Sequence, residues 1–508
     1  MAGKVSEKPS TPRAAHPVPA GILAPPADRT AFTRASVALS FDLIDKDSSI
    51  ATLAATLRRQ IDVLQAGAVL PSTRALVERH HVSPVTVSRA LAQLAAEGLV
   101  TVRPGAGSFV NERGRPAAED RVDTSWQAVP LADRSIDASR LGFLLQPAPD
   151  GVLSLAAGYP HPDLMATGAL TAAAARAARR PGVWDRPPAL GLQRLRSWFA
   201  RSLGGAFDAD DVLVTDGGQS ALSTAFRALL APGAPVLVES PTYLGALAAA
   251  RSAGLRTVPV PIDEGGLQLD KLSDAFSSTG SRVLYCQPTF QNPTGGVLAN
   301  DRREGVLKLA ASAGAFVIED DYARWLSHRS PAPAPLASED RDGRVVYITS
   351  ITKPTSANLR IGAIIARGPV AERLRNLRLV DDFFASRLLQ ETALELLDSP
   401  AWTRHLHTLS AALSARCAAT IKAVSRNLPT ASIVQVPQGG MHIWLRLVDG
   451  MDDTKIAEEA ERAGVLVMPG RPFYAAEPPG AHVRLSFCGV SHTRELEEAI
   501  VRLSRACA

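Results

Sequence analysis

A lysine flanked by a serine and an arginine is the group in this chain best suited to covalent chemistry. Lys353 lies in the segment Ser350-Ile-Thr-Lys-Pro-Thr-Ser-Ala-Asn-Leu-Arg360, after the apolar run 344–348. Such a run predicts a strand, and ligands bind beyond the carboxyl ends of strands in open α/β sheets. A lysine amine forms a Schiff base with an aldehyde, and a hydroxyl and a guanidinium suit a phosphate. The spacing therefore indicates that Lys353 carries pyridoxal 5′-phosphate (PLP) and that Ser350 and Arg360 hold its phosphate.

The elements that would position this lysine are predicted by an alternation of apolar and helical segments after about residue 151. Strand-like runs occur at 212–215, 235–239, 282–286, 315–319 and 345–348. Their alternation with helical patterns predicts an α/β domain with a mostly parallel sheet and helices on both faces. Two further runs, 441–446 and 482–486, lie among mixed patterns and predict a smaller C-terminal lobe.

Two of these runs are followed by groups that would hold the phosphate and the ring of the cofactor. Gly217, Gly218 and Gln219 form a turn that opens a helix, whose backbone N–H groups attract a phosphate. Tyr243 would stack its ring on the pyridine. A glycine turn, a tyrosine or an S-x-x-K pattern is common by itself, so each counts only as a member of the set.

The next two runs are followed by groups that would face the polar atoms of the pyridine. Asn292 would donate to the phenolic oxygen, although its Pro and Gly neighbours also fit a simple turn. A carboxylate at the ring nitrogen keeps it protonated, so that the ring accepts electrons. Asp320 is preferred for this role and Asp321 is the alternative, because the two point in different directions. Tyr322 would donate to the same phenolic oxygen.

A late arginine is the candidate group for substrate binding. Arg484, in the predicted strand 482–486, would bind a carboxylate with its forked guanidinium, and pairing with an internal acid is the alternative. Four cysteines are far apart and form no C-x-x-C pair, so neither a metal site nor a disulfide framework is expected.

The order of these motifs resembles that of fold-type I aminotransferases over about 350 residues, through GGQSAL, SPTY, QNPTG, EDDY, SITK…LR and VRLSF. The resemblance implies the same roles for the residues named above, with Lys353 as the Schiff-base lysine and Arg484 as the carboxylate clamp. Two positions depart from the family. Arg186 replaces a tyrosine that reaches the phosphate across the dimer, which leaves that contact open, and Thr352 replaces a serine.

An N-terminal unit at 39–112 is predicted to contain three helices. A helical stripe occupies 50–64. Ser72 would cap a second helix, and Ser83 would cap a third with Pro84 at its first position, where proline is favoured. A short turn joins the second helix to the third, which is the arrangement of a helix-turn-helix unit.

A strand pair completes this unit. The third helix would end at Gly98, and the runs 99–102 and 108–110 would pair around a glycine-rich wing. Three helices and a wing form a winged helix-turn-helix, whose last helix enters the DNA major groove. The segments LPSTRAL, VSPVTVSRALAQLAAEGLV and RPGAGSFV closely resemble the GntR family of bacterial regulators over about 60 residues.

The GntR resemblance implies DNA contacts from the second helix, the third helix and the wing. Pro84 departs from the arginine that is usual in the family, so one contact is missing or moved. One such unit makes few phosphate contacts, so two units on two half-sites of double-stranded DNA are expected. The implied contact residues are Arg74, Ser83, Thr86, Ser88, Arg89, Gly105 and Gly107.

Composition limits the remaining classes of protein. Residues 1–38 are rich in Pro, Ala and Ser and predict a flexible tail, and 113–150 predict a linker with one helix near 137–144, before the aminotransferase-like domain at 151–508. No apolar run of about eighteen residues and no secretory signal are found, which indicates a cytoplasmic protein without a membrane partner. The net charge of +5 permits an acidic partner without requiring one.

A GntR-like unit joined to an aminotransferase-like domain resembles the MocR type of regulator, which is often a homodimer. The resemblance implies a DNA-binding transcription regulator that holds PLP as an internal aldimine on Lys353, senses an amino compound or PLP itself, and has no net enzymatic turnover. The first alternative is an active PLP-dependent aminotransferase with a DNA-binding appendage. The second is a DNA-binding protein with an inactive enzyme domain. The effector, the operator and the sign of regulation stay open.

Overall fold

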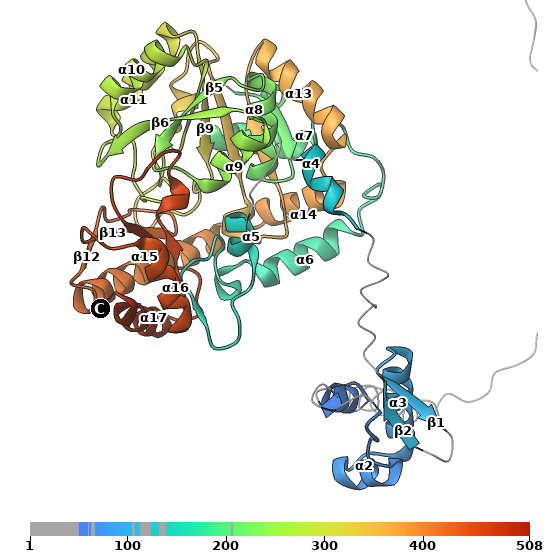
Figure 1. The fold of residues 1–508 in the computed structure, drawn as a ribbon. Helices are drawn as coiled ribbons and strands as arrows, with labels where there is room; N and C mark the ends of the chain where they lie inside the picture. Colours follow the sequence, from blue (N-terminus) through green and yellow to red (C-terminus); the bar gives the residue numbers. More distant parts are fainter. Residues whose placement is uncertain are drawn as a thin grey trace, which may run out of the picture. The chain divides into compact units, whose positions relative to one another are not determined.

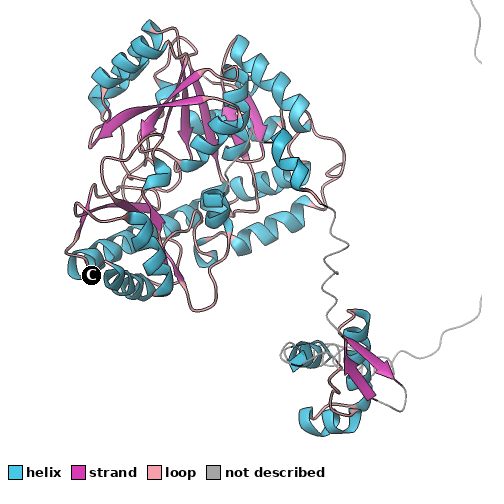
Figure 2. Ribbon diagram, viewed as in Figure 1, coloured by secondary structure: helices cyan, strands magenta, loops and turns pink. Residues whose placement is uncertain are grey.

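The computed structural model describes residues 50–58, 60–61, 64, 67–103, 107–111, 123–131, 139–204 and 207–507, and the predicted tail at 1–38 lies outside them. The chain forms two compact units, Met1–Ala132 and Asp133–Ala508 (Figures 1 and 2). No helix in the described ranges is long and apolar enough to cross a membrane.

The first unit contains the predicted helices and wing. Residues 50–58 and 60–61 are helical, followed by α2 (Thr73–His80) and α3 (Pro84–Ala96). Strands β1 (Val100–Arg103) and β2 (Gly107–Val110) pair antiparallel. Their shared core consists of Leu53, Leu57, Ile61, Leu76, Val87, Leu91, Leu94, Val100 and Val110.

Side-chain caps set the boundaries of the two helices. The Ser72 hydroxyl accepts a hydrogen bond from the backbone N–H of Ala75 at 3.2 Å, and the Ser83 hydroxyl accepts one from that of Thr86 at 3.1 Å. Each bond satisfies an N–H group that has no partner within the first turn of its helix. Gly98 follows α3 with φ +70°, a conformation that glycine adopts without strain. The winged helix-turn-helix prediction is therefore confirmed.

The second unit is built on an eight-stranded sheet with the order β4-β11-β10-β9-β8-β5-β6-β7. Neighbouring strands are parallel except at β11 and β7, which run antiparallel to their partners. The predicted, mostly parallel sheet is therefore confirmed. Its strands are β4 (Val212–Thr215), β5 (Pro235–Ser240), β6 (Arg256–Asp263), β7 (Gly266–Leu267), β8 (Val283–Cys286), β9 (Phe316–Asp321), β10 (Val345–Ser350) and β11 (Gly362–Ile365).

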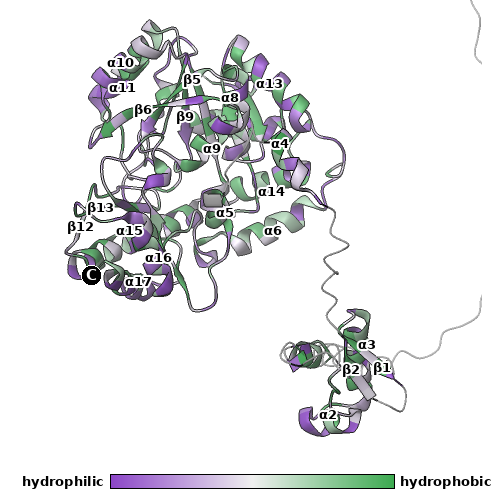
Figure 3. Ribbon diagram, viewed as in Figure 1, coloured by the Kyte–Doolittle hydropathy of each residue, from purple (hydrophilic) through white to green (hydrophobic). Residues whose placement is uncertain are grey.

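Helices cover both faces of this sheet. Alternate strand residues enter two separate cores: on β4, for example, Val212 and Val214 pack in one and Leu213 in the other. One core includes residues of α6 (Thr167–Ala177), α7 (Gln193–Leu203), α10 (Leu269–Thr279), α11 (Asn300–Ser312) and α14 (Arg387–Leu397). The other includes residues of α8 (Gly218–Leu229), α9 (Leu244–Ser252) and α13 (Pro369–Asp382). Burial on both faces explains why the strands are continuous apolar runs, whereas surface helices such as α10 and α11 mix hydrophobic and hydrophilic residues (Figure 3).

A smaller lobe at the C-terminal end is also confirmed. It has a four-stranded antiparallel sheet in the order β12-β13-β16-β15, and a short parallel pair joins β14 (Val465–Leu466) to β3 (Leu153–Ser154). The strands are β12 (Ala431–Ile433), β13 (His442–Leu447), β15 (Met468–Pro469) and β16 (His482–Ser486), and the helices are α15 (Pro400–Asn427), α16 (Asp453–Arg462) and α17 (Thr493–Ala506).

Two short helices precede this core in the chain. They are α4 (Ala128–Leu131) and α5 (Ser139–Leu145), and α5 is the helix that was predicted near 137–144. Leu141, Phe143 and Leu144 of α5 pack against a small cluster that includes Trp444 and Phe473. This packing holds α5 on the second unit.

Candidate functional site

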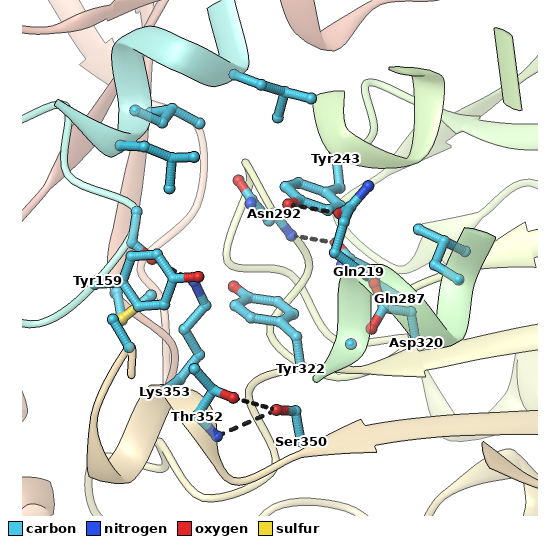
Figure 4. A pocket seen from close by; sticks show the side chains of 18 of the residues that line it. Tyr159, Gln219, Tyr243, Gln287, Asn292, Asp320, Tyr322, Ser350, Thr352 and Lys353 are labelled. Atoms are coloured by element: carbon cyan, nitrogen blue, oxygen red, sulfur yellow. Dashed lines mark hydrogen bonds between the residues drawn. The ribbon is translucent and has the colours of Figure 1, made fainter. Parts of the chain in front are cut away.

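A cavity of about 450 Å³ gathers most of the residues that the sequence singled out. It lies where β9 and β10 end and where α8 begins, which is the edge of the sheet at which the sequence placed a ligand (Figure 4). The predicted residues that line it are Gly218, Gln219, Tyr243, Asn292, Asp320, Tyr322, Ser350, Lys353, Arg360 and Arg484.

One end of the cavity is an anion cradle. Gly217 caps α8 with φ +84°, and a β-carbon at this position would lie 2.9 Å from Nη2 of Arg360. The same Nη2 donates to the Asp216 carbonyl at 2.8 Å. A β-carbon on Gly218 would lie 3.9 Å from that of Ser350. The start of α8, the guanidinium and the serine therefore surround one space, and the positive end of the helix favours an anion there.

The Ser350 hydroxyl also shapes the turn that carries the lysine. It accepts a hydrogen bond from the backbone N–H of Thr352 at 3.1 Å and lies 2.9 Å from the Thr352 hydroxyl. This contact fixes the backbone immediately before Lys353. Thr352, which departs from the usual serine, lines the same cavity.

Lys353 lies half-buried beside a tyrosine that the sequence analysis did not single out. Its Nζ donates to the Gly158 carbonyl at 2.5 Å and lies 3.5 Å from the centre of the Tyr159 ring. Burial lowers the pKa of Lys353 to about 7, and the positive charges of Arg484 and Arg360 act in the same direction. A lowered pKa leaves part of the amine neutral and nucleophilic near pH 7.

A buried carboxylate lies across the cavity. Oδ2 of Asp320 accepts hydrogen bonds from the Tyr285 hydroxyl and from Nε2 of Gln287, both at 2.8 Å. Burial raises the pKa of Asp320, and these two bonds oppose that change. Asp321 does not line the cavity; it accepts a bond from the Tyr347 hydroxyl at 2.8 Å instead. The alternation of side chains along β9 thus separates the two acids.

The amide of Asn292 is oriented by Arg484. Nη1 of Arg484 donates to Oδ1 of Asn292 at 3.1 Å, and Nη2 donates to the Ala156 carbonyl at 2.8 Å. Because a guanidinium has donors only, the amide must present its oxygen to Arg484, which leaves its NH₂ group for another acceptor. Arg484 is 1% exposed, and its Nε has no partner among the described residues.

The two predicted tyrosines are held by hydrogen bonds to neighbouring groups. The Tyr243 hydroxyl donates to Oε1 of Gln219 at 3.2 Å, and the Tyr322 hydroxyl donates to the Phe290 carbonyl at 2.9 Å. Burial raises the pKa of both tyrosines, so both keep their protons at neutral pH. Figure 4 shows Tyr322 facing the Lys353 amine, with Tyr159 on the other side of that amine.

Other residues of the cavity were missed because they come from distant segments. Tyr159 precedes the sheet by some fifty residues, and His442 begins β13 in the smaller lobe. Nδ1 of His442 is buried and has no partner among the described residues. Burial, together with Arg484 and Lys353, lowers the pKa of His442 well below its ordinary value, so the imidazole is neutral. Near these two residues, the sequence offers only glycines as a local sign of a site: one immediately before Tyr159, and two in the segment Gly439-Gly440-Met441 that precedes His442.

The predicted DNA-contact residues differ in exposure. Arg74, Ser88 and Arg89 are exposed, and Nε of Arg74 lies 3.2 Å from a Glu78 oxygen. Thr86 is only 6% exposed. Its hydroxyl lies 2.9 Å from that of Ser83, so both help to cap α3. Gly107 begins β2 with φ +111°, and Gly105 lies outside the described residues.

Comparisons with known proteins match both units. The aminotransferase class I and II family matches residues 153–503, and the bacterial regulatory proteins of the gntR family match residues 50–110. The 2-aminoadipate transaminase of Thermus thermophilus is 32% identical over 70% of this chain and 90% of its own length. The crystal structure of LysN, the α-aminoadipate aminotransferase of Thermus thermophilus, complexed with N-(5′-phosphopyridoxyl)-L-leucine, is 31% identical, with a TM-score of 0.70 over 75% of this chain and 98% of its own.

Relatives that share both units are regulators by name. The uncharacterized HTH-type transcriptional regulator YdfD of Bacillus subtilis is 25% identical over 86% of this chain and 91% of its own length. The uncharacterized HTH-type transcriptional regulator YjiR of Escherichia coli is 26% identical over 89% of this chain and 97% of its own. The chain therefore belongs to the aminotransferase class I and II family and joins that domain to a gntR-family helix-turn-helix unit, as in regulators of the MocR type.

Proposed function

We propose that this protein is a DNA-binding regulator whose second unit binds PLP covalently through Lys353 and senses a small amino compound. The observation that carries the proposal is the meeting of three groups in one cavity: an amine with a lowered pKa, an anion cradle and a buried carboxylate. When bound, PLP supplies an aldehyde that takes up amines and a ring that accepts electrons.

The residues present fit this group. A phosphate at the start of α8 would meet its backbone N–H groups, the Ser350 hydroxyl and the Arg360 guanidinium. Asp320 would hold a proton at the ring nitrogen, because a buried carboxylate needs a charged partner. Tyr243 would stack on the ring, with its hydroxyl fixed by Gln219.

The phenolic oxygen would be met by Asn292 first. Its NH₂ group is directed away from Arg484, whereas the Tyr322 hydroxyl already donates a hydrogen bond to the Phe290 carbonyl. Tyr322 would therefore have to exchange that bond in order to donate to the cofactor. Arg484, which lines the cavity, would bind the carboxylate of an amino acid with its guanidinium.

We also propose that the protein acts as a homodimer on two DNA half-sites. Trp184, Val380 and Phe383 of the second unit are 77%, 81% and 66% exposed, and aromatic side chains are enriched at protein–protein interfaces. Arg186, in the same loop as Trp184, is exposed and available to a partner subunit. Arg74, Ser88 and Arg89 would contact the DNA, with Gly105 and Gly107 of the wing beside them.

Reconstitution of the full-length protein with PLP tests the cofactor assignment. We expect a visible absorbance band, and borohydride reduction should fix the cofactor on the peptide that contains Lys353, as seen by mass spectrometry. Lys353→Ala should abolish both signals. Operator binding should then change when PLP or an amine is added. A colourless protein with no modified lysine would rule out the proposal.

Active transamination is the second candidate function, because the chain retains the arginine suited to a substrate carboxylate together with the lysine. A curated relative is also named as a transaminase. Steady turnover of an amino acid and a 2-oxo acid would favour this function. A single half-reaction that stops would favour the regulator.

A further inference from the structure

The cavity continues from the lysine to an apolar wall. Leu141, Leu144 and Leu145 of α5 line the same space as Lys353 and Arg484. Helix α5 borders the cavity on the side of Tyr159 (Figure 4, where the ribbon has the colours of Figure 1). An amino acid whose amine would take the place of Lys353 on the cofactor, and whose carboxylate would bind Arg484, would extend its side chain into the remaining space, where this wall lies.

The three leucines differ in how they are held. Leu141 and Leu144 pack against the cluster around Trp444 and Phe473 and are partly buried. Leu145 is 69% exposed although it lines a cavity. An apolar ligand group would cover this side chain, and removal of apolar surface from water favours binding.

The cavity offers no partner for a charged side chain. Among the described residues that line it, the charged ones are Lys353, Arg360, Arg484 and Asp320, and each has a partner in the proposed function. No cation remains for a second carboxylate, and no acid remains for a second amine. His442 is neutral because its environment lowers its pKa. A buried charge without a partner is strongly unfavourable.

We infer that the sensed compound is an α-amino acid with an uncharged, apolar side chain, and that Leu141, Leu144 and Leu145 select it. This inference rests on the proposed function, because it takes the cofactor carried by Lys353 and the Arg484 guanidinium as the anchors of the amino acid.

Titration of the PLP-loaded full-length protein tests the inference. The probes are L-leucine, L-phenylalanine, L-glutamate and L-lysine, and the readout is the spectral shift of the cofactor. We expect the two apolar amino acids to bind at least about tenfold more tightly than the charged ones. Equal or tighter binding of L-glutamate or L-lysine would overturn the inference while leaving the cofactor assignment intact. If PLP does not load at Lys353, both proposals fail.

A variant pair separates the wall from general effects. Leu145→Ser should weaken L-leucine binding about tenfold, because the ligand loses its apolar contact. It should not change the melting temperature, since Leu145 is largely exposed. Val448→Ser is the matched control, because Val448 is 49% exposed and does not line the cavity. Equal L-leucine affinity in both variants would contradict a role for Leu145.

Hydrogen exchange provides a readout that does not depend on the cofactor spectrum. Binding of L-leucine should slow the exchange of the backbone amides of 139–145, because the ligand packs against α5 and stabilises it. L-Glutamate at the same concentration should leave these amides unchanged. Equal protection by both amino acids, or protection by neither, would refute the contact.

Discussion

The reactivity of Lys353 is set by where its amine lies. The ring of Tyr159 and the walls of the cavity shield it from water, and two guanidinium groups lie in the same cavity. Burial and these charges favour the neutral amine, so a larger fraction of Lys353 is unprotonated near pH 7 than for an ordinary lysine. Asp320 opposes this effect, because its negative charge favours the ammonium form.

The uptake of PLP by the cofactor-free protein should therefore depend on pH around 7 rather than around the ordinary lysine value of 10.5. The reactive amine is depleted below pH 7 and predominates above it, so the rate should rise with pH through this region. Stopped-flow absorbance measures the rate. Asp320→Asn removes a charge that favours the ammonium form, so its profile should move to lower pH. A rate that keeps rising up to pH 10 would contradict the lowered pKa.

Glycine at position 217 permits the positive φ of the backbone there and leaves room for the guanidinium of Arg360 in the anion cradle. We expect Gly217→Ala to lose PLP affinity, because its β-carbon would lie 2.9 Å from Nη2 of Arg360 and displace it. The backbone at this position, with φ +84° and ψ 175°, is essentially restricted to glycine and adds a cost of about 1–3 kcal/mol to the free energy of folding. Equilibrium dialysis and urea denaturation measure the two effects.

Gly233→Ala is the matched control for this change. Gly233 has φ +85°, against +84° at Gly217, and a β-carbon there would meet no atom within 4 Å. Both variants should lose stability, because both glycines have a positive φ, but only Gly217→Ala should lose PLP affinity. Equal loss of affinity in both would mean that backbone strain, and not the displaced Arg360, is responsible.

At the scale of elements, local patterns predicted most of the framework. The strands β4, β5, β8, β9 and β10 were expected because each is an apolar run buried on both faces. The strand β11 was not predicted, because it begins with glycine and follows the lysine segment closely. Its position between β4 and β10 depends on contacts far apart in the sequence.

The cavity was predictable only where a strand ends in a motif. Asp320 lies near the end of β9, and Lys353 and Asn292 follow β10 and β8 of the same sheet, so their proximity follows from the parallel order. Tyr159, His442 and the leucines of α5 belong to segments outside this sheet, and no local sequence pattern predicts that they line the cavity. Thr86 is a residue that the sequence pattern includes but the structure does not favour. Its type and position fit a DNA contact, but its side chain is buried against Ser83.

The third helix of the first unit offers a prediction at this scale. Arg89 is exposed on α3, so Arg89→Ala should weaken operator binding by about 1–3 kcal/mol if its guanidinium contacts a base. Arg79→Ala removes the same charge from the last turn of α2, outside the expected contact set, and should have a smaller effect. Both should melt as the unchanged protein does. Gel-shift titration measures the operator affinity of both variants. An equal loss of operator affinity in the two would contradict the assignment of Arg89 as a base contact.

At the scale of the whole molecule, regulation requires that the ligand favours one arrangement of the DNA-binding units over another. A ligand that binds both arrangements equally tightly changes nothing. The affinity for DNA with two half-sites would depend on that arrangement only if two chains are joined in a dimer. The oligomeric state is therefore part of the proposed mechanism.

Val380→Asp tests this requirement. Val380 is 81% exposed, so the change should not unfold the chain, but a charge within an apolar interface should separate the subunits. Analytical ultracentrifugation should show a dimer for the unchanged protein and a monomer for the variant. The dimer should bind DNA with two half-sites at least about 100-fold more tightly than DNA with one, and the monomer should lose this difference, because the second contact is no longer intramolecular. Val436→Asp, at a position 60% exposed in the smaller lobe, is the control and should remain dimeric. A monomeric unchanged protein, or a Val380→Asp variant that still distinguishes the two DNAs, would exclude this interface.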